Sequence, residues 1–120
     1  MKIFVSHSNE FDYGNELYKP IRFSQLNKEY EFFLPHEDGT SVNTQEIIKN
    51  SDLILAEVSF PSTGQGIELG WANFSKIPVV CFYKENKKIS GSLKYLTQDF
   101  FTYSDSKDFI SKLESVLKSK

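Results

Sequence analysis

The alternation of short apolar runs with helical segments constrains this fold more than any other feature of the sequence. Five runs are rich in β-branched and aromatic residues and short enough to form buried strands. They cover residues 2–6, 30–34, 52–58, 77–83 and 100–103. Strands that alternate with helices indicate βαβ units, in which a parallel sheet carries helices on both faces. The sequence therefore predicts a three-layer α/β fold, flavodoxin-like or Rossmann-like, whose five parallel strands follow the doubly wound order 2-1-3-4-5.

The helical segments of the first half are short. Residues 15–27 carry apolar side chains on one side, which is typical of a helix. Pro20 is expected to break this helix or to start a second one, because proline is tolerated in a first turn but not in a helix interior. Thr44 is predicted to cap a short helix that passes through residues 47–48.

Two helices are predicted in the second half. One covers residues 66–75, and the other lies near the end of the sequence, where a single apolar stripe has helical spacing. The members of this stripe are Phe109, Ile110, Leu113, Val116 and Leu117. Ser104 or Ser106 is expected to cap the first turn of this last helix.

Composition limits the functions that fit the chain. The 120 residues are near the usual size of one domain, so we expect a single domain over residues 1–120. The net charge is -2 and no basic stripe is present, so nucleic acid is not an expected partner. No apolar stretch approaches the ~20 residues of a membrane span, so no membrane partner is expected either. An unpaired cysteine in a buried run, Cys81, and the lack of a signal peptide favour the cytoplasm.

A loop of small residues joins the third strand to the next helix. Residues 59–65 lie beyond the carboxyl end of that strand, at the switch point where doubly wound sheets bind ligands. Gly64 and Gly66 have no Cβ, so a ligand can reach backbone N–H groups at a helix start, where the dipole favours an anion. Ser62 and Thr63 add hydroxyl donors, and together these residues predict a phosphate cradle. The spacing fits neither a Walker A loop nor a complete dinucleotide fingerprint, so neither a cofactor nor a metal ion is expected.

Glu68 follows this loop, in what the sequence predicts to be the first turn of a helix. Two interpretations stay open. A carboxylate in the first turn offsets the helix dipole, which is worth roughly 0.3–1 kcal/mol. A carboxylate beside a ligand pocket can instead act as a nucleophile or stabilise a cationic centre, as in glycoside chemistry.

The stretch that contains Glu68 resembles a known family. Residues 52–72 read DLILAEVSFPSTGQGIELGWA and are similar to the signature of the nucleoside 2-deoxyribosyltransferase family, which includes the 2'-deoxynucleoside 5'-phosphate N-hydrolases. The similarity continues through residues 76–81 to residues 91–93. The resemblance implies the same five-stranded fold and sites that are completed across a homodimer interface. It also implies that Glu68 is the family nucleophile, which attacks the anomeric carbon and releases the base from a covalent glycosyl-enzyme intermediate.

Two serines favour the hydrolases within this family. The transferases tend to have an acidic residue where Ser62 stands, whereas the hydrolases have a serine, which suits a 5'-phosphate. Ser92 matches the hydrolase position that reaches a phosphate in the neighbouring subunit. Hydroxyl donors without a nearby carboxylate are what an anionic ligand needs. Ser92 can also cap a helix that begins at Leu93.

Three positions depart from the family's pattern. Thr44 stands where the family has an aspartate, and a hydroxyl of this kind cannot act as an acid. Phe4 replaces the tyrosine of the hydrolases and lacks its hydroxyl group. The first loop, residues 7–10, lacks their arginine. A proton donor to the leaving base must therefore come from elsewhere, and the candidates are Asp12, Tyr13, His36 and Glu37.

Two histidines follow the ends of predicted strands. His36 follows the second strand and resembles a hydrolase histidine near the base, although it can also be an ordinary loop residue. His7 comes directly after the first strand, where a phosphate or ribose would lie, and its alternative role is to order the loop. Ser8 is expected to contact the same phosphate.

The leading hypothesis is an enzyme that cleaves the N-glycosidic bond of a nucleoside 5'-monophosphate or deoxynucleoside, by hydrolysis or transfer. The phosphate would contact Ser8, Ser62, Gly64, Gly66 and Ser92 of the partner subunit. The alternative is a nucleotide-binding or sensor domain on the same fold, with catalysis lost along with the acid at position 44. A third hypothesis rests on residues 3–8, which resemble the opening of TIR domains, some of which cleave NAD.

Overall fold

The structure has the predicted sheet. A computed structural model describes residues 1–39 and 42–120. Its five strands are all parallel and lie in the order β2-β1-β3-β4-β5. The strands are β1 (Lys2–His7), β2 (Glu31–Phe33), β3 (Leu53–Glu57), β4 (Val79–Lys84) and β5 (Phe100–Tyr103). The predicted fold class and strand order are confirmed.

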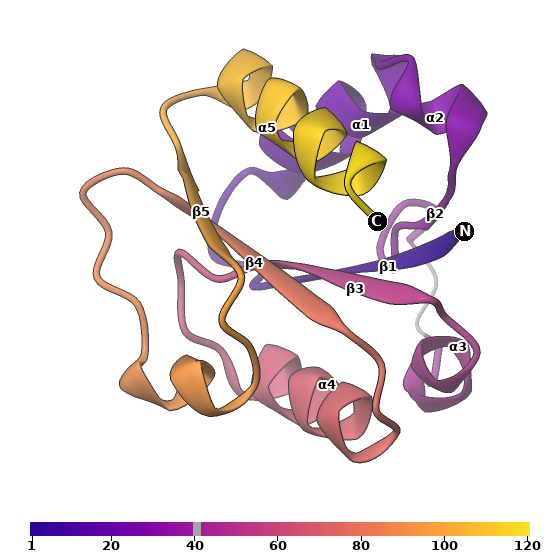
Figure 1. The fold of residues 1–120 in the computed structure, drawn as a ribbon, viewed down its shortest axis with the longest axis vertical. Helices are drawn as coiled ribbons and strands as arrows, with labels where there is room; N and C mark the ends of the chain where they lie inside the picture. The colour runs from indigo at the N-terminus through magenta and orange to yellow at the C-terminus, as the bar shows by residue number, and fades with distance from the viewer. Residues whose placement is uncertain (40–41) are drawn as a thin grey trace.

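Helices cover both faces of the sheet (Figure 1). On one face lie the π-helical turn η1 (Gly14–Tyr18), α1 (Lys19–Phe23), α2 (Leu26–Glu29) and α5 (Ser106–Lys118). On the other face lie α3 (Gln45–Lys49), α4 (Thr63–Phe74) and the 3-10 turn η2 (Gly91–Tyr95). The protein is therefore built in the three layers that the sequence predicts.

Each face of the sheet has its own buried core. Successive side chains of a strand point to opposite faces, so Ile3 and Val5 of β1 join the core under α1 and α5, while Phe4 joins the core over α4. The last helix supplies Phe109 and Leu113 to the first core. Burial on both faces explains why the strands read as continuous apolar runs in the sequence.

The carboxyl ends of β1 and β3 lie side by side. Their register pairs Ser6 with Ala56 and His7 with Glu57. The chain leaves these two ends toward opposite faces, since η1 follows β1 and α4 follows β3. This is the topological switch point, so the loops after β1 and β3 border the crevice where a ligand is expected.

The predicted helix over residues 15–27 is divided into three pieces. Pro20 lies in the first turn of α1, which confirms that it starts a second helix. A further break at Ser24 was not predicted, and this residue is extended, with ψ at 162°. The Ser24 hydroxyl donates to the carbonyl of Ile21, at 2.7 Å. Such local bonds from a serine compete with the helical hydrogen bonds and explain why α1 ends there.

Two predicted helix caps are wrong. Thr44 precedes α3 but makes no capping hydrogen bond, and the side chain of Asn43 accepts from the N–H of Gln45 instead, at 3.0 Å. The first turn of α5 is capped by Asp105, whose carboxylate accepts from the N–H of Asp108 at 2.8 Å, rather than by a serine beside it. A short carboxylate or amide in the extended residue before a helix is well suited to this role.

The helix that carries Glu68 begins earlier than predicted. α4 starts at Thr63 instead of Gly66, and Ser62 is its N-cap. The Ser62 hydroxyl accepts from the N–H of Gln65 at 3.2 Å. Glu68 therefore lies beyond the first turn, so the interpretation of this carboxylate as a first-turn partner of the helix dipole is wrong.

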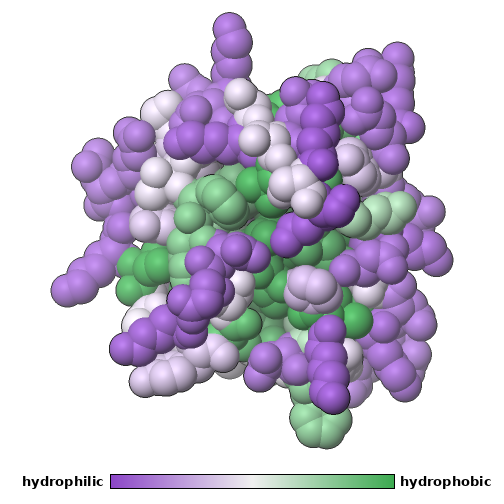
Figure 2. Space-filling model, viewed as in Figure 1, coloured by the Kyte–Doolittle hydropathy of each residue, from purple (hydrophilic) through white to green (hydrophobic). Residues whose placement is uncertain are grey.

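The surface is mixed in polarity. Figure 2 shows hydrophilic residues around the rim of one face and hydrophobic residues in its middle. The most exposed large apolar side chains include Phe23, Phe74 and Tyr95. No helix in the described part of the chain is both long enough and apolar enough to cross a bilayer.

Candidate active site

The carboxylate of Glu68 is held by two hydroxyl groups from other elements. Ser6, near the end of β1, donates to Oε1 of Glu68 at 2.8 Å. Thr44, just before α3, donates to Oε2 at 3.0 Å. The Glu68 side chain is half-buried, whereas Ser6 is fully buried. Both oxygens of the carboxylate are thereby fixed at the carboxyl edge of the sheet, and each keeps a free lone pair.

Burial raises the pKa of the Glu68 carboxyl above its usual value. The hydrogen bonds from Ser6 and Thr44 act in the opposite direction and stabilise the charged form, as does the nearby His36. A carboxylate that is partly desolvated and held by donors is a candidate functional group, since perturbed side chains of this kind gather at reactive sites.

Sequence reasoning missed both partners of Glu68. The sequence predicts Ser6 as the end of a strand and Thr44 as a helix cap and a lost acid, but neither as a partner of Glu68. The sequence separations of 62 and 24 residues leave no local pattern that joins them to Glu68. The hydroxyl of Thr44 is directed at the carboxylate of Glu68 and makes no capping bond to α3.

His7 lies at the centre of a buried hydrogen-bonded chain. Its Nδ1 donates to the carbonyl of Ser8 at 2.8 Å, so its Nε2 accepts from the Tyr18 hydroxyl at 2.6 Å. Tyr18 in turn accepts from the backbone N–H of His36, at 3.1 Å. This chain ties the loop after β1 to η1 and to the loop after β2.

Burial lowers the pKa of His7 to about 4, so the ring is neutral near pH 7. The rings of Tyr13 and Tyr18 lie 4.5 and 5.1 Å from it, measured between centroids. With both ring nitrogens bonded, His7 orders the loops in this structure. Ser8 is also buried, and its hydroxyl accepts from the N–H of Glu10 at 3.0 Å.

His36 is the exposed member of this aromatic group. Its ring centroid lies 5.6 Å from that of His7 and 5.9 Å from that of Tyr13. The residue that follows it, Glu37, forms two hydrogen bonds with Arg22, at 2.7 and 2.8 Å. These bonds hold the pKa of the Glu37 carboxyl below its usual value. The loop after β2 is therefore held at His36 by Tyr18 and at Glu37 by Arg22.

Only part of the predicted phosphate cradle has backbone N–H groups that a ligand could use. The N–H of Gly66 donates to the carbonyl of Ser62 at 3.1 Å, so it is not available to a ligand. The expectation of a free amide at Gly66 is wrong because the helix starts before it. Gly64, in the first turn, lies among the positions whose N–H groups have no partner within a helix.

Ser62, Gly66 and Ser92 are brought together by the structure. They line one cavity of about 310 Å³ between α4 and η2. Its other lining residues are Val58, Pro61, Gln65, Leu69, Gly70, Ser90, Leu93 and Leu96. The N-cap of η2 is Ser90, whose hydroxyl accepts from the N–H of Ser92, so the alternative capping role of Ser92 is wrong. Glu68 and Gly64 are not among the residues that line this cavity.

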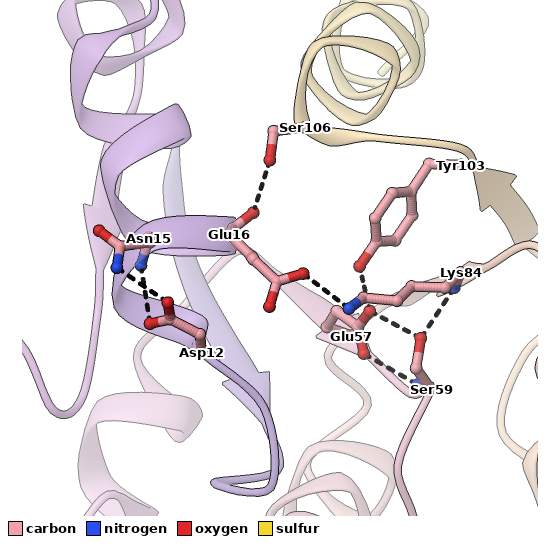
Figure 3. Close-up of polar contacts among 8 residues, drawn as sticks. All are labelled: Asp12, Asn15, Glu16, Glu57, Ser59, Lys84, Tyr103 and Ser106. Atoms are coloured by element: carbon pink, nitrogen blue, oxygen red, sulfur yellow. Dashed lines mark hydrogen bonds and ion pairs between the residues drawn. The ribbon is translucent and has the colours of Figure 1, made fainter.

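A buried carboxylate that sequence reasoning did not single out lies at the end of β3 (Figure 3). Glu57 is 1% exposed and accepts from the N–H and the hydroxyl of Ser59, both at 2.8 Å. The hydroxyl of Tyr103 also donates to it, which with burial raises the pKa of Tyr103 far above its usual value. Ser59 accepts from the N–H of Lys84, whose side chain pairs with Glu16 at 2.7 Å. This cluster joins the ends of β3, β4 and β5 beneath the loop that leads to α4.

Other candidate groups are held by their surroundings. Cys81 is fully buried, as predicted, and burial raises the pKa of its thiol to about 12. The carboxylate of Asp12 accepts from the backbone and side chain of Asn15. Within residues 1–39 and 42–120, no group of three or more His, Cys, Asp or Glu side chains could hold a metal ion.

Comparison with known sequences finds relatives for parts of the chain. No family model matches it. It is 30% identical over 76 residues to a protein of Thermofilum pendens and 41% identical over 44 residues to a protein of Methanosarcina barkeri. Both carry the provisional name 2'-deoxynucleoside 5'-phosphate N-hydrolase 1. The first match covers 59% of this chain and 53% of that protein, and the second covers 37% and 28%. The chain thus matches about half or less of the length of these curated relatives.

Solved structures share the fold. The CMP N-glycosidase of Clostridium botulinum has a TM-score of 0.69 and 21% identity, and the match covers 95% of this chain and 99% of that one. The 2-desoxiribosyltransferase of Leishmania mexicana has a TM-score of 0.55 and 19% identity, with 68% and 63% covered. At these identities the likeness is one of fold.

The fold and the site define a flavodoxin-like α/β protein with a hydrogen-bonded carboxylate at its topological switch point. Within that class, the sequence relatives and the solved structures confirm the resemblance to the nucleoside 2-deoxyribosyltransferase family.

Proposed function

We propose that the protein cleaves the N-glycosidic bond of a nucleoside 5'-monophosphate or deoxynucleoside, with Glu68 as nucleophile. The observation that carries this proposal is the Glu68 carboxylate, held between the hydroxyls of Ser6 and Thr44 at the carboxyl edge of the sheet. The named activities of the sequence relatives and of the solved structures support the same reaction class.

In the proposed reaction, an oxygen of Glu68 forms a bond to the anomeric carbon as the bond from that carbon to the base nitrogen breaks. The bonding electrons leave with the base, which takes up a proton. Water, or a second base, then attacks the anomeric carbon and frees the carboxylate. The bonds from Ser6 and Thr44 support this role because they favour the charged form of Glu68 and fix its direction.

His36 is the proton donor that the surroundings favour over Asp12 and Glu37. Asp12 is occupied by Asn15, and the pairing with Arg22 keeps Glu37 ionised, so neither is suited to donate a proton. The ring of His36 is exposed and interacts electrostatically with Glu68. An exposed imidazole beside the carboxylate can carry a proton to the leaving base, as a general acid must.

The phosphate of a nucleotide would bind near the start of α4. The N–H of Gly64 lies in the first turn, where the helix dipole attracts an anion. Ser62 and Gly66 line a cavity beside this turn, and Gly66 has no side chain to fill it. Ser8 and His7 are buried and bonded within the loop after β1, so their part in phosphate binding is to hold this loop in place.

A homodimer remains part of the proposal. Ile67 and Phe74 form an exposed apolar face on α4, being 50% and 91% exposed, and Tyr95 on η2 is 79% exposed. Large exposed apolar side chains of this kind favour burial against a second subunit. In that assembly Ser92 of one subunit would reach the phosphate held by the other. Sedimentation of the protein at micromolar concentration should show a dimer, and a monomer would contradict this part of the proposal.

A covalent intermediate provides the direct test of the role of Glu68. The protein is mixed with a panel of nucleoside and deoxynucleoside 5'-monophosphates, quenched in acid and digested. Mass spectrometry should find the mass of a sugar phosphate added to the peptide that contains Glu68. The search for the adduct is made in the quenched steady state and after trapping with a slow substrate. Release of free base without the adduct would contradict nucleophilic catalysis by Glu68.

The second candidate is a nucleotide-binding or sensor domain that has lost catalysis. It is favoured by Thr44, which donates to Glu68 and offers no ionisable acid. It predicts nucleotide binding in the micromolar range without release of base. Calorimetry with the same panel tests it, because turnover by the wild-type protein contradicts this candidate and binding without turnover contradicts the enzymatic one.

A further inference from the structure

A buried amide fastens α4 to the ends of two strands. Gln65 is 5% exposed, and its Nε2 donates to the carbonyl of Ser6 at 3.1 Å and to the carbonyl of Glu57 at 2.8 Å. These carbonyls belong to neighbouring strands, since the next residue of β1, His7, pairs with Glu57. One side chain of α4 therefore bonds to both of the paired strands β1 and β3.

The same amide is connected to Glu68 through Ser6. The carbonyl of Ser6 accepts from Gln65, and its hydroxyl donates to Oε1 of Glu68. Gln65 and Glu68 are three residues apart on α4, so they are neighbours on the helix surface. Helix, amide, serine and carboxylate form a closed ring of bonds between α4 and β1.

We propose that Gln65 is a positioning residue that sets the Glu68 carboxylate against Ser6. The inference rests on the proposed function in that Glu68 is taken as the reacting group. Gln65 acts on Glu68 through Ser6, whose carbonyl accepts from the amide and whose hydroxyl donates to the carboxylate.

A primary amide is the side chain that this place requires. Two N–H groups on one nitrogen serve two carbonyl acceptors, which an ionised carboxylate or an apolar side chain of the same length cannot do. The backbone N–H of Gln65 also donates to the hydroxyl of Ser62. Gln65 thus joins the start of α4 to β1 and β3, one helical turn before Glu68.

A double-mutant cycle on the pKa of Glu68 tests the proposal without any turnover. The carboxyl is followed by carbon NMR through a pH titration in wild type, Ser6→Ala, Gln65→Met and the double variant. His36 and Tyr18, which also interact electrostatically with Glu68, are left unchanged. Ser6→Ala removes a donor to the charged form and should raise the pKa of Glu68. Gln65→Met should raise it as well, and the double variant should match Ser6→Ala alone.

Gln98→Met is the matched control. Gln98 is exposed and its amide also donates to a backbone carbonyl, that of Lys94 at 3.3 Å, but it lies outside the Glu68 network. Its replacement should leave the pKa of Glu68 unchanged. Should Gln65→Met fail to fold, Gln65→Asn replaces it, because the shorter amide cannot reach both carbonyls. The proposal would be overturned if Gln65→Met left the pKa of Glu68 unchanged. It would also be overturned if the pKa shifts caused by Ser6→Ala and Gln65→Met added in full in the double variant.

Once base release is established, the kcat and KM of Gln65→Met provide a second test of the positioning role. Displacement of a reacting group by about 1 Å costs on the order of 10²-fold in rate, so Gln65→Met should lower kcat by about that factor with little change in KM. A change in KM alone would contradict a positioning role. Failure of the proposed function is seen separately, as base release that does not depend on Glu68.

Discussion

The carboxylate of Glu68 is flanked by hydroxyl groups that cannot act as acids. Ser6 and Thr44 hold one oxygen each, and burial raises the pKa of the group while these donors lower it. The arrangement suits a nucleophile, since it fixes a charged oxygen without neutralising it. Within residues 1–39 and 42–120 the two hydrogen bonds to this carboxylate come from hydroxyl groups, which is why we expect the neighbouring loop to protonate the leaving base.

Replacement of Thr44 by aspartate tests whether the missing acid limits the reaction. A second carboxylate in contact with Glu68 raises the pKa of one member of the pair, which can then donate a proton. Thr44→Asp should release base about 10²-fold faster than wild type, the lower end of the usual gain from general acid catalysis. The control is Thr44→Asn, which has the same size and does not ionise. Equal rates for the two variants would show that position 44 supplies no acid.

At the scale of elements, capping decides where the helices begin. α5 starts after Asp105, whose carboxylate accepts from the N–H of Asp108. Asp105→Ala should lower the free energy of unfolding by about 1 kcal/mol, the usual effect of a lost N-cap. Ser111→Ala, in the exposed middle of the same helix, should change it by less than about 0.5 kcal/mol. Urea denaturation measures both, and equal effects would contradict the cap assignment.

Elements with a strong local repeat were predicted well from the sequence. The five apolar runs became the five strands in the predicted order, and the apolar stripe of the last helix became buried. The breaks around Ser24 and the caps at Asn43 and Asp105 were missed, because several polar residues in each stretch can form the competing bond.

The candidate site was predicted only where its residues are close in sequence. Glu68 and the serine at the start of its helix lie in one recognisable stretch. The hydroxyls that hold Glu68, the amide of Gln65 and the carboxylate of Glu57 were not foreseen as a network, because their partners come from other strands and loops. Such contacts follow from the strand order and register, which no local spacing encodes.

At the scale of the whole molecule, the buried His7 makes stability depend on pH. Its pKa is about 4 in the folded protein and near 6.5 in an unfolded chain. The unfolded state therefore binds the extra proton first as the pH falls, and stability decreases from pH 6.5 toward pH 4. The loss is on the order of 3 kcal/mol at the lower end. Glu68 has the opposite effect on stability because its pKa is raised in the folded protein. Its contribution lowers the free energy of unfolding as the pH rises through the folded pKa.

Urea denaturation at several pH values between 4 and 7 checks this dependence. His7→Gln removes the titrating group, so the variant should lose less stability than wild type as the pH falls through this range. An unchanged slope in the variant would assign the acid sensitivity to other groups. Comparison at pH 7 separates the pH effect from the general cost of replacing a buried side chain.

Release of base from nucleoside 5'-monophosphates by wild type and Glu68→Gln tests the central claim most directly. The amide keeps the size of the side chain and removes the charge that attacks the sugar. The account predicts that the wild-type protein releases base from at least one nucleotide and that the variant does so at least about 10³-fold more slowly. Equal rates of release in the two proteins would contradict it.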